Sequence, residues 1–231
     1  MVIKMYDLAG AEDERRFSPY CWRVKMALAH KGLEVETIPW RYMEKEKIAF
    51  SGQGKVPVII DGDTTVYDSW DIANYLDDKY PNKPSLFGSA EAKGQALFIK
   101  HWTENVLHPN LYPLPFQDIV EHLHEKDKVY FRESKEAWLG KSIEEFVGNP
   151  QDKLKQLNVI LNPLRKTLEM QSFIAGEQPN FSDYIVFAPF QLARSVSPQK
   201  LLAKEDPIYV WRDKMLNLYD RLAGKAMGYD V

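Results

Sequence analysis

Three short stretches of the sequence carry polar residues that could act on a ligand, and the first is Ser18-Pro19-Tyr20-Cys21. It has the form of a dithiol redox motif, Cys-Pro-Tyr-Cys, with serine at the first position. Proline is favoured in the first turn of a helix, so Ser18 is predicted to cap the helix that follows. The free amides and the dipole of a helix N-terminus favour negative charge at this corner.

A thiolate supplied by a ligand is an anion that suits this corner. A thiol with an ordinary pKa of about 8.5 is mostly protonated at neutral pH, and lowering that pKa by two units takes about 2.7 kcal/mol. A hydroxyl that donates to a charged sulfur contributes roughly 1.5–3 kcal/mol, and the helix end adds about 0.3–1 kcal/mol. Ser18 therefore has two interpretations: it caps the helix only, or it also holds the sulfur of a ligand.

Two other nucleophiles near this corner fit less well. Ser18 would itself need a neighbouring base, but His30 lies 12 residues further along the same predicted helix, about 18 Å away at 1.5 Å per residue. Cys21 lies in the apolar stripe of that helix and is predicted to be a buried packing residue. It is the only cysteine, which excludes an intrachain disulfide and a cysteine-rich metal site.

The second stretch, GKVPVII, places Pro57 in an otherwise apolar strand, where proline removes a hydrogen-bond donor. A cis Val56-Pro57 bond would turn the backbone and leave Val56 free to pair with a peptide-like ligand. The alternative is an edge strand with proline at its tip. The third stretch begins Tyr-Asp-Ser-Trp, where Asp68 and Ser69 stand between a strand and a helix. They could bind a carboxylate and an ammonium group, or could serve only as helix caps.

The elements that must position these stretches follow from hydrophobic spacing. Strand patterns at 2–6, 33–38, 56–60 and 64–67 alternate with helical patterns at 18–31 and 69–79, which predicts a small α/β domain over residues 1–80. Prolines and Gly88 mark a linker at about 80–89. Helical patterns then follow at 90–107, 126–146, 151–170, 181–194 and 207–222, so that residues 90–231 are predicted to form an all-α domain.

Composition excludes several function classes. The 231-residue chain is 45% apolar, enough for a sizeable core. Its formal net charge of −3 argues against nucleic acid as a main partner, because binding to the phosphate backbone needs a concentrated basic face. No apolar run approaches the roughly 20 residues that cross a bilayer, and the first ten residues do not resemble a signal peptide. We therefore expect a cytoplasmic protein with no membrane partner.

The wording SPYCWRVKMALAHKG, VPVIIDG and VYDSWDIANYLDDKYP resembles the glutathione transferase family over nearly the whole chain. The resemblance implies an α/β thioredoxin-like N-terminal domain plus an all-α helical C-terminal domain, with glutathione as co-substrate and a homodimeric state. It makes Ser18 the catalytic residue that activates the glutathione sulfur. It assigns glutathione binding to Tyr20, Lys55, Val56, Pro57, Asp68 and Ser69.

Two further features refine the resemblance. The family usually has Ser or Thr followed three residues later by Asp at the start of a core helix, and this chain has Asn180 and Asp183, which we assign to folding. The motif wording is most similar to the etherase-like bacterial and fungal branch, whose members include enzymes that cleave β-aryl ethers. The resemblance thus implies an attack of the glutathione thiolate on a hydrophobic or aromatic electrophile.

Tyr20 and several aromatic residues of the second domain are candidates for the electrophile pocket. The candidates are Tyr20, Trp102, Tyr112, Phe116 and Trp138. The segment Pro109–Phe116 contains three prolines and is predicted to be irregular at the pocket mouth. The alternative is that these aromatic side chains are ordinary core. The one metal-like cluster, around His122 and His124, has a spacing of two that does not place both histidines on one helix face, so we predict no metal site.

Three functions remain open at this level. The first is a glutathione transferase. The second is a protein that binds glutathione or an apolar ligand without turnover. The third is thiol-disulfide exchange through Cys21, which the serine at the first motif position disfavours.

Overall fold

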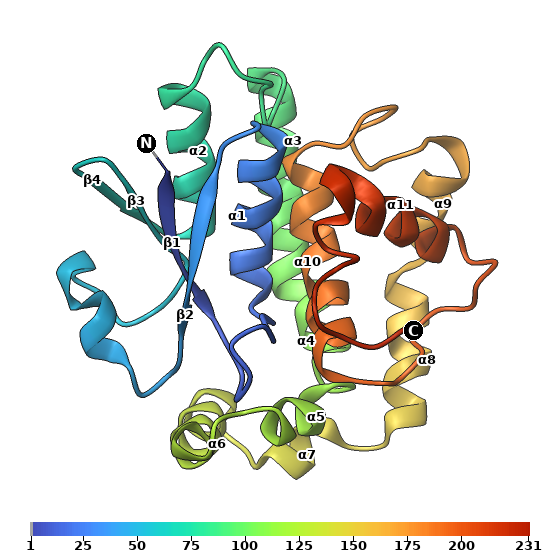
Figure 1. The fold of residues 1–231 in the computed structure, drawn as a ribbon. Coiled ribbons are helices and arrows are strands. Elements are labelled where there is room, and N and C mark those ends of the chain that lie inside the picture. Colours follow the sequence, from blue (N-terminus) through green and yellow to red (C-terminus); the bar gives the residue numbers. More distant parts are fainter. Residues whose placement is uncertain (1) are drawn as a thin grey trace.

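The first part of the chain forms a sheet with helices on one face (Figure 1). The computed structural model describes residues 2–231. Within them, one mixed sheet has the strand order β2-β1-β3-β4, with bounds β1 Ile3–Leu8, β2 Val35–Trp40, β3 Val58–Asp61 and β4 Thr64–Tyr67. β1 runs parallel to β2, as a helical crossover requires, whereas β1–β3 and β3–β4 pair antiparallel.

Helix α1 (Pro19–His30) is the central element of the molecule. It packs against α2 (Ser69–Lys79) and, on its other side, against α10 (Phe181–Val196). In Figure 1 it lies between the sheet and the helical half of the chain. Every residue from Cys21 to Leu28 is therefore buried, and the residues that precede α1 lie where the two halves meet.

The rest of the chain is helical. The remaining helices are α3 Ala90–Trp102, α4 His108–Leu111, α5 Phe116–Glu121, α6 Glu125–Leu139, α7 Ile143–Val147, α8 Pro150–Ile160, α9 Asn162–Met170 and α11 Pro207–Arg221, with a 3₁₀ helix η1 at Lys45–Ser51 and a π-helical turn η2 at Thr103–Leu107. Asn180 and Asp183 form a capping box at the start of α10, which confirms the sequence interpretation.

Two long helices predicted from the sequence are each divided in two, so those predictions were wrong. Gly140 adopts a left-handed φ of 67° and ends α6 within the predicted 126–146 helix. Ser142 then starts α7 with its own capping box. In the predicted 151–170 helix, Leu161 separates α8 from α9, and Pro163 occupies the first turn of α9, where its missing N–H does no harm.

Three local features differ from the expectation as well. The predicted 90–107 helix changes to a π turn after Trp102, and this turn leads directly into α4. The segment Pro109–Phe116, predicted to be irregular, is helical up to Leu111 and again from Phe116, with turns between. The strand β3 begins at Val58 rather than at residue 56, because the Val56-Pro57 bond is cis and precedes the ladder.

Candidate functional site

Ser18 lies at the buried N-terminus of α1. Its side chain is 4% exposed, and its Oγ accepts a hydrogen bond of 3.3 Å from the Cys21 backbone N–H, so the predicted cap is confirmed. Accepting this bond uses the oxygen and not the hydroxyl proton. A serine in this arrangement caps its helix and can still donate its O–H to an acceptor that lies beyond the helix end.

Cys21 is unsuited to react with a ligand. Its side chain is 0% exposed, as the sequence analysis predicted for a packing residue. Burial, followed by the nearby charge of Asp7, raises the pKa of the Cys21 thiol far above its usual value. The thiol therefore stays protonated and inaccessible in the folded protein.

The Val56-Pro57 peptide bond is cis, as the sequence analysis proposed. Because β3 starts at Val58, Val56 takes no part in the strand registers of the sheet. Val56 is half-buried and packs against both hydrophobic clusters of the chain. Its backbone thus lies where the two hydrophobic clusters meet and outside the ladder of the sheet.

Asp68 and Ser69 form the start of α2. Asp68 has a φ of 66°, a left-handed value that is rare for a residue with a side chain. Its Oδ1 accepts from the backbone N–H groups of Trp70 (2.7 Å) and Asp71 (3.3 Å). Ser69 is 1% exposed, and within the described residues its Oγ has no hydrogen-bond partner. A buried hydroxyl without a partner is uncommon in proteins, so Ser69 can donate to or accept from a ligand at the start of α2.

The amine of Lys135 lies near the amine of Lys55. Burial and the charge of Lys55 both lower the pKa of the Lys135 amine on α6. Between residues 2 and 231, the ion pairs of the structure include neither of these two lysines. Two cations that share a neighbourhood without an anion favour a carboxylate there.

The residues predicted for the electrophile pocket lie in four different settings. Tyr20 is 36% exposed and Tyr112 is half-buried, and both belong to one aromatic group described below. Trp102 is half-buried against the main core. Phe116 is 4% exposed and packs against the rings of Phe131 and Phe146, so it is a core side chain. Trp138 is 73% exposed on α6.

His108 joins Tyr20 to Tyr112, and the sequence analysis missed it. Its ring stacks on Tyr112 at 4.5 Å between centroids and meets Tyr20 edge-on at 5.9 Å. The Arg23 guanidinium lies over the Tyr20 ring and donates to Glu104 at 2.8 Å. The spacing of four between Glu104, His108 and Tyr112 is the sequence signal that could have indicated a shared helix face.

The structure was also searched for a metal site and for a membrane-spanning helix. Within residues 2–231, no cluster of three or more His, Cys, Asp or Glu side chains could hold a metal ion. His122 instead pairs with the Tyr229 hydroxyl at 3.1 Å, and His124 caps α6. The same described part of the chain contains no helix that is both long and apolar enough to span a bilayer.

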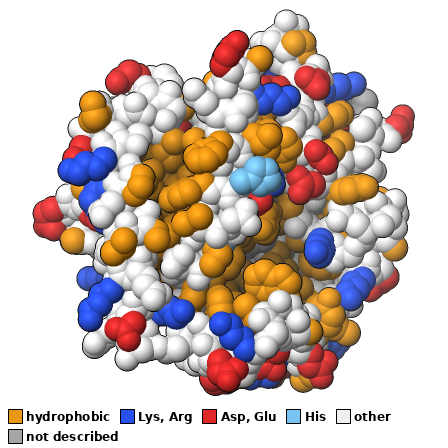
Figure 2. Space-filling model, turned by 180° about the vertical axis from the view of Figure 1, so that it is seen from behind, with side chains coloured by type: hydrophobic (Ala, Val, Ile, Leu, Met, Phe, Trp, Pro, Cys, Tyr) orange, Lys and Arg blue, Asp and Glu red, His pale blue; other side chains and the backbone are white. Residues whose placement is uncertain are grey.

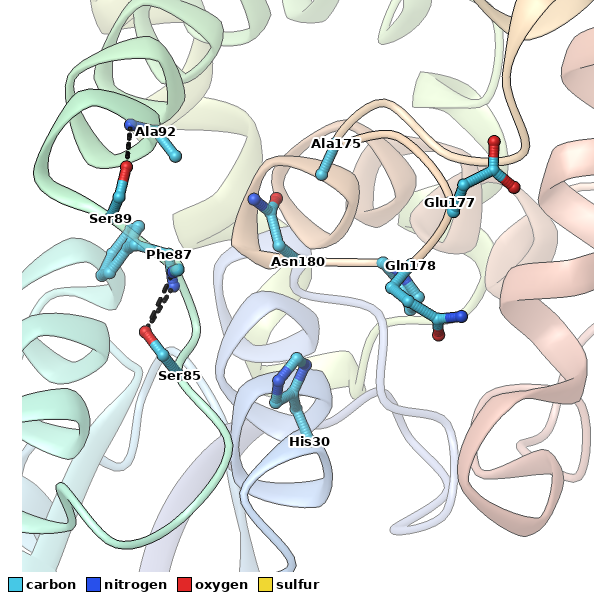
Figure 3. Close-up of a pocket in the computed structure, with 11 residues that line it drawn as sticks. His30, Ser85, Phe87, Ser89, Ala92, Ala175, Glu177, Gln178 and Asn180 are labelled. Carbon is cyan, nitrogen blue, oxygen red and sulfur yellow. Dashed lines mark hydrogen bonds between the residues drawn. The ribbon is translucent and has the colours of Figure 1, made fainter.

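A shallow cavity lies at the far end of α1. It has a volume of about 620 Å³ and is lined by residues that include His30, Phe87 and Gln178. Figure 3 shows Ser85, Phe87 and Ser89 on one side and the segment from Ala175 to Asn180 on the other. Ser85 and Ser89 both bond to backbone N–H groups of their own turns. His30 is separated from Ser18 by the length of α1, so this cavity is distinct from the candidate site.

Comparisons with known proteins cover both halves of the chain. The family model described as "Glutathione S-transferase, N-terminal domain" matches residues 14–84. The one described as "Glutathione S-transferase, C-terminal domain" matches residues 95–214, more than half of the chain.

Individual relatives share less than a third of their residues with this chain in the aligned regions. Glutathione S-transferase Z1 of Arabidopsis thaliana is 29% identical over 126 residues, which are 52% of this chain and 54% of that protein, so the chain spans about half the length of this relative. Glutathione S-transferase F10 of the same plant is 24% identical over 84% of this chain and 86% of its own length.

A solved structure extends the likeness to the whole fold. A glutathione S-transferase of Ceriporiopsis subvermispora in complex with glutathione is 21% identical, with a TM-score of 0.81 over 96% of this chain and 97% of that chain. At this identity the likeness concerns the fold alone. It confirms the predicted fold class, an α/β thioredoxin-like N-terminal domain plus an all-α helical domain.

Proposed function

Because the chain belongs to the glutathione S-transferase family, we propose that it is a glutathione transferase whose Ser18 hydroxyl stabilises the glutathione thiolate. The thiolate attacks an electrophilic carbon of a hydrophobic or aromatic compound. The observation that carries the proposal is the Ser18 side chain, whose oxygen caps α1 while its proton remains available to a sulfur anion. The buried setting strengthens such a bond relative to water.

The other parts of glutathione are assigned to residues of the same N-terminal domain. Val56, held outside the ladder by Pro57, pairs with the cysteinyl backbone of glutathione. The γ-glutamyl end lies at Asp68 and Ser69, where the unpartnered Ser69 hydroxyl is one of its donors. Lys55 takes the glycine carboxylate, supported by the absence of a counter-charge beside it among the described ion pairs. Tyr20 lies between glutathione and the electrophile.

The electrophile meets the sulfur on the side of the aromatic group. Tyr20 and Tyr112 are the residues of the predicted pocket whose setting suits this role, and half-buried Trp102 is a more distant candidate. Phe116 supports the wall from within the core rather than lining it. We propose residues 1–80 as the glutathione-binding domain and 90–231 as the domain that supplies the electrophile contacts.

Replacing Ser18 by Ala tests the proposal directly. Turnover of 1-chloro-2,4-dinitrobenzene should fall about tenfold to a hundredfold, because one hydrogen bond to a charged atom is lost. The dissociation constant of glutathione, measured by titration calorimetry, should change less than about threefold. Ser142→Ala is the matched control, since Ser142 also caps a helix but lies on the remote α7. Unchanged turnover in Ser18→Ala would remove Ser18 from the chemistry.

A finer proposal concerns the etherase-like branch, which rests on motif wording, while the two Arabidopsis relatives carry Z and F names. In β-aryl ether cleavage the sulfur forms a C–S bond, the C–O bond breaks with its electron pair on the aryloxide, and water supplies the proton. Incubation with a β-aryl ether dimer and glutathione should release the phenol. Its absence, with dinitrobenzene conjugation intact, would remove the branch and leave the transferase.

Two alternative functions make different predictions. A binding protein without turnover would retain glutathione and yield no conjugate across a panel of electrophiles analysed by mass spectrometry. Thiol-disulfide exchange through Cys21 is not favoured, because burial keeps that thiol protonated and out of contact with a ligand.

We also propose a homodimer in the cytoplasm, where reduced glutathione is available. Figure 2 views the molecule from the side opposite to Figure 1 and shows hydrophobic side chains gathered in a broad patch. The exposed large hydrophobic residues include Phe50 on η1, Tyr67 on β4 and Phe98 on α3. Patches of this kind mark interaction surfaces, and a second copy of the chain is our proposed partner. Light scattering at micromolar concentration checks the mass.

A further inference from the structure

Helix α6 belongs to the helical half of the chain but is bound to the N-terminal domain. Asp127 is 1% exposed, and its carboxylate accepts hydrogen bonds from the backbone N–H groups of Tyr42 at 3.2 Å and Met43 at 3.0 Å. These two residues follow β2, and Figure 1 shows α6 below the end of that strand. The Tyr42 ring also lies 5.7 Å from the Phe131 ring, centroid to centroid. A buried carboxylate with two donors from the other domain holds α6 at this position.

One face of α6 is turned toward the N-terminal domain. Asp127, Phe131 and Lys135 follow one another at a spacing of four residues, so they share this face. Phe131 is 2% exposed and belongs to the same hydrophobic cluster as Ile48 of η1, and Val56 packs against that cluster. The next turn of the same face carries Lys135, about 6 Å along the helix from Phe131. Lys135 is therefore directed toward the connection between η1 and β3.

Lys135 is a half-buried cation. Its ammonium group lies 5.6 Å from the centre of the Phe131 ring and 6.0 Å from that of the Trp138 ring. Such contacts with aromatic rings stabilise a cation weakly and do not replace an anion. The ion pairs of residues 2–231 do not include Lys135, and the acid on its face, Asp127, is already occupied by two backbone donors. The Lys135 ammonium thus remains able to bind an anionic group.

Lys55 brings a second cation to the same place from the N-terminal domain. It is exposed in the connection between η1 and β3 and directly precedes Val56. Burial, and then the charge of Lys55, lowers the pKa of the Lys135 amine, so the two ammonium groups act on each other. Two like charges in one neighbourhood repel, and an anion between them removes that repulsion.

We propose that Lys135 and Lys55 together bind the terminal carboxylate of glutathione, so that the helical domain completes the binding site of the peptide. The inference rests on the proposed function and adds to it a residue of the second domain. Antiparallel pairing with Val56 places the ligand's next residue, glycine, beside Lys55, because the two chains run in opposite directions. A carboxylate has two oxygens and can accept from an ammonium group on each side.

This arrangement makes Lys135 a binding residue without a part in the chemical step. The terminal carboxylate does not react, so its contacts are equal in the bound substrate and in the transition state. Contacts of that kind change KM and leave kcat unchanged. The proposed role of Ser18 differs, because the bond from its hydroxyl to the sulfur acts on the reacting atom.

Lys135→Met tests the proposal with two peptides that differ in one group. Glutathione carries the carboxylate, whereas γ-glutamylcysteinyl ethylamide has an ethyl group in its place. The variant should raise the dissociation constant of glutathione about fivefold to twentyfold and change that of the ethylamide less than about twofold, both by titration calorimetry. Lys135→Arg keeps the charge and should restore most of the preference. An unchanged ratio of the two constants in Lys135→Met would overturn the role of Lys135.

A matched control lies on the same helix. Lys128 donates to Glu125 at 2.6 Å and thus already has an anionic partner. Lys128→Met removes one positive charge from α6 and should leave the affinities of both peptides within about twofold of the wild type. If Lys128→Met weakens glutathione as much as Lys135→Met does, the effect belongs to the total charge of the helix, and the specific contact is refuted.

Kinetics separates this inference from the proposed function. With 1-chloro-2,4-dinitrobenzene, Lys135→Met should raise KM for glutathione about fivefold to twentyfold and leave kcat at saturating glutathione within about twofold. If the wild-type protein binds glutathione and conjugates it but Lys135→Met leaves KM unchanged, Lys135 has no such role and the transferase proposal stands. If the wild-type protein binds neither peptide, both proposals fail. A fall in kcat as large as the rise in KM would also contradict a role in binding alone.

Discussion

The chain contains two buried polar clusters that differ in how their atoms are paired. Around Asp183, four donors reach one carboxylate: the backbone N–H groups of Ile174, Ala175 and Asn180, and the Trp211 indole N–H, at 2.8–3.4 Å. In a second group, the α4 cluster of Arg23, Thr103, His108 and Tyr112, five buried side-chain atoms make no hydrogen bond within the described residues. The first cluster is fully paired within the chain, whereas the second leaves these five atoms unpaired.

This difference separates folding from function. A carboxylate that accepts four hydrogen bonds fixes the start of α10 against α11 and the preceding loop, and no ligand could add to it. The Tyr112 hydroxyl, by contrast, stabilises nothing in the isolated chain. Ser69 has the same property at the start of α2. The three predictions that follow test whether pairing, rather than burial alone, decides what each group contributes to stability.

The largest effect is expected at Asp183. Asp183→Ala leaves four donors without their acceptor in the core, and should lower the free energy of unfolding by about 3–5 kcal/mol. Urea unfolding followed by tryptophan fluorescence measures the change. Asp152→Ala, at an exposed first-turn aspartate of α8, is the control and should cost less than about 1 kcal/mol. If Asp183→Ala lowers the free energy of unfolding by less than about 1 kcal/mol, the four hydrogen bonds to this carboxylate do not stabilise the fold more than an exposed cap does.

The second prediction concerns pH and His108. Its folded pKa lies below the unfolded value of about 6.5, so the unfolded chain takes up the proton first as pH falls. Stability from this group is therefore present above pH 6.5 and is lost below it, at up to about 1.4 kcal/mol per pH unit. His108→Gln should reduce the loss of unfolding free energy between pH 6.5 and 5 accordingly.

A matched control isolates His108 from the other titrating groups. The pKa of His30 is also lowered by burial, so part of the acid dependence persists in His108→Gln. Glu104, which contacts the same arginine, has a lowered pKa because its bonds to Arg23 and Lys100 outweigh burial, and it titrates below this range. Replacing exposed His101 with Gln should leave the slope unchanged. An identical slope in His108→Gln would show that this imidazole is not held neutral.

The cap within the complete cluster could be predicted from the sequence, whereas the bonds of Asp183 with Ile174, Ala175 and Trp211 and the contacts of the incomplete cluster could not. The caps at Ser18 and Asn180 depend on a few neighbouring residues, so their short motifs indicated them correctly. The cis Val56-Pro57 bond was also a local inference. His108 contacts Tyr20 from α4, which directly follows a π turn, and a periodic sequence pattern does not indicate the inserted residue of such a turn.

Sequence spacing also failed to separate the aromatic residues of a pocket from those of the core. Tyr112 and Phe116 have similar surroundings in the sequence, four positions apart in a proline-rich segment. In the structure, Phe116 packs into the core against Phe131, whereas Tyr112 keeps a hydroxyl free. Spacing alone does not distinguish a pocket side chain from a core side chain, because both are apolar on the same face.

The smallest effects should appear in two tyrosines whose hydroxyl groups differ in their hydrogen-bond partners. The Tyr184 hydroxyl bonds His30 Nδ1 at 2.6 Å and also the Tyr219 hydroxyl. Tyr184→Phe leaves both groups unpaired and should lower the free energy of unfolding by about 1–2 kcal/mol. Tyr112→Phe removes a hydroxyl that has no partner, and should leave that free energy unchanged or raise it by up to about 1 kcal/mol. If Tyr112→Phe destabilises the protein as much as Tyr184→Phe does, its hydroxyl is part of the folded network, and the contrast between the two clusters is lost.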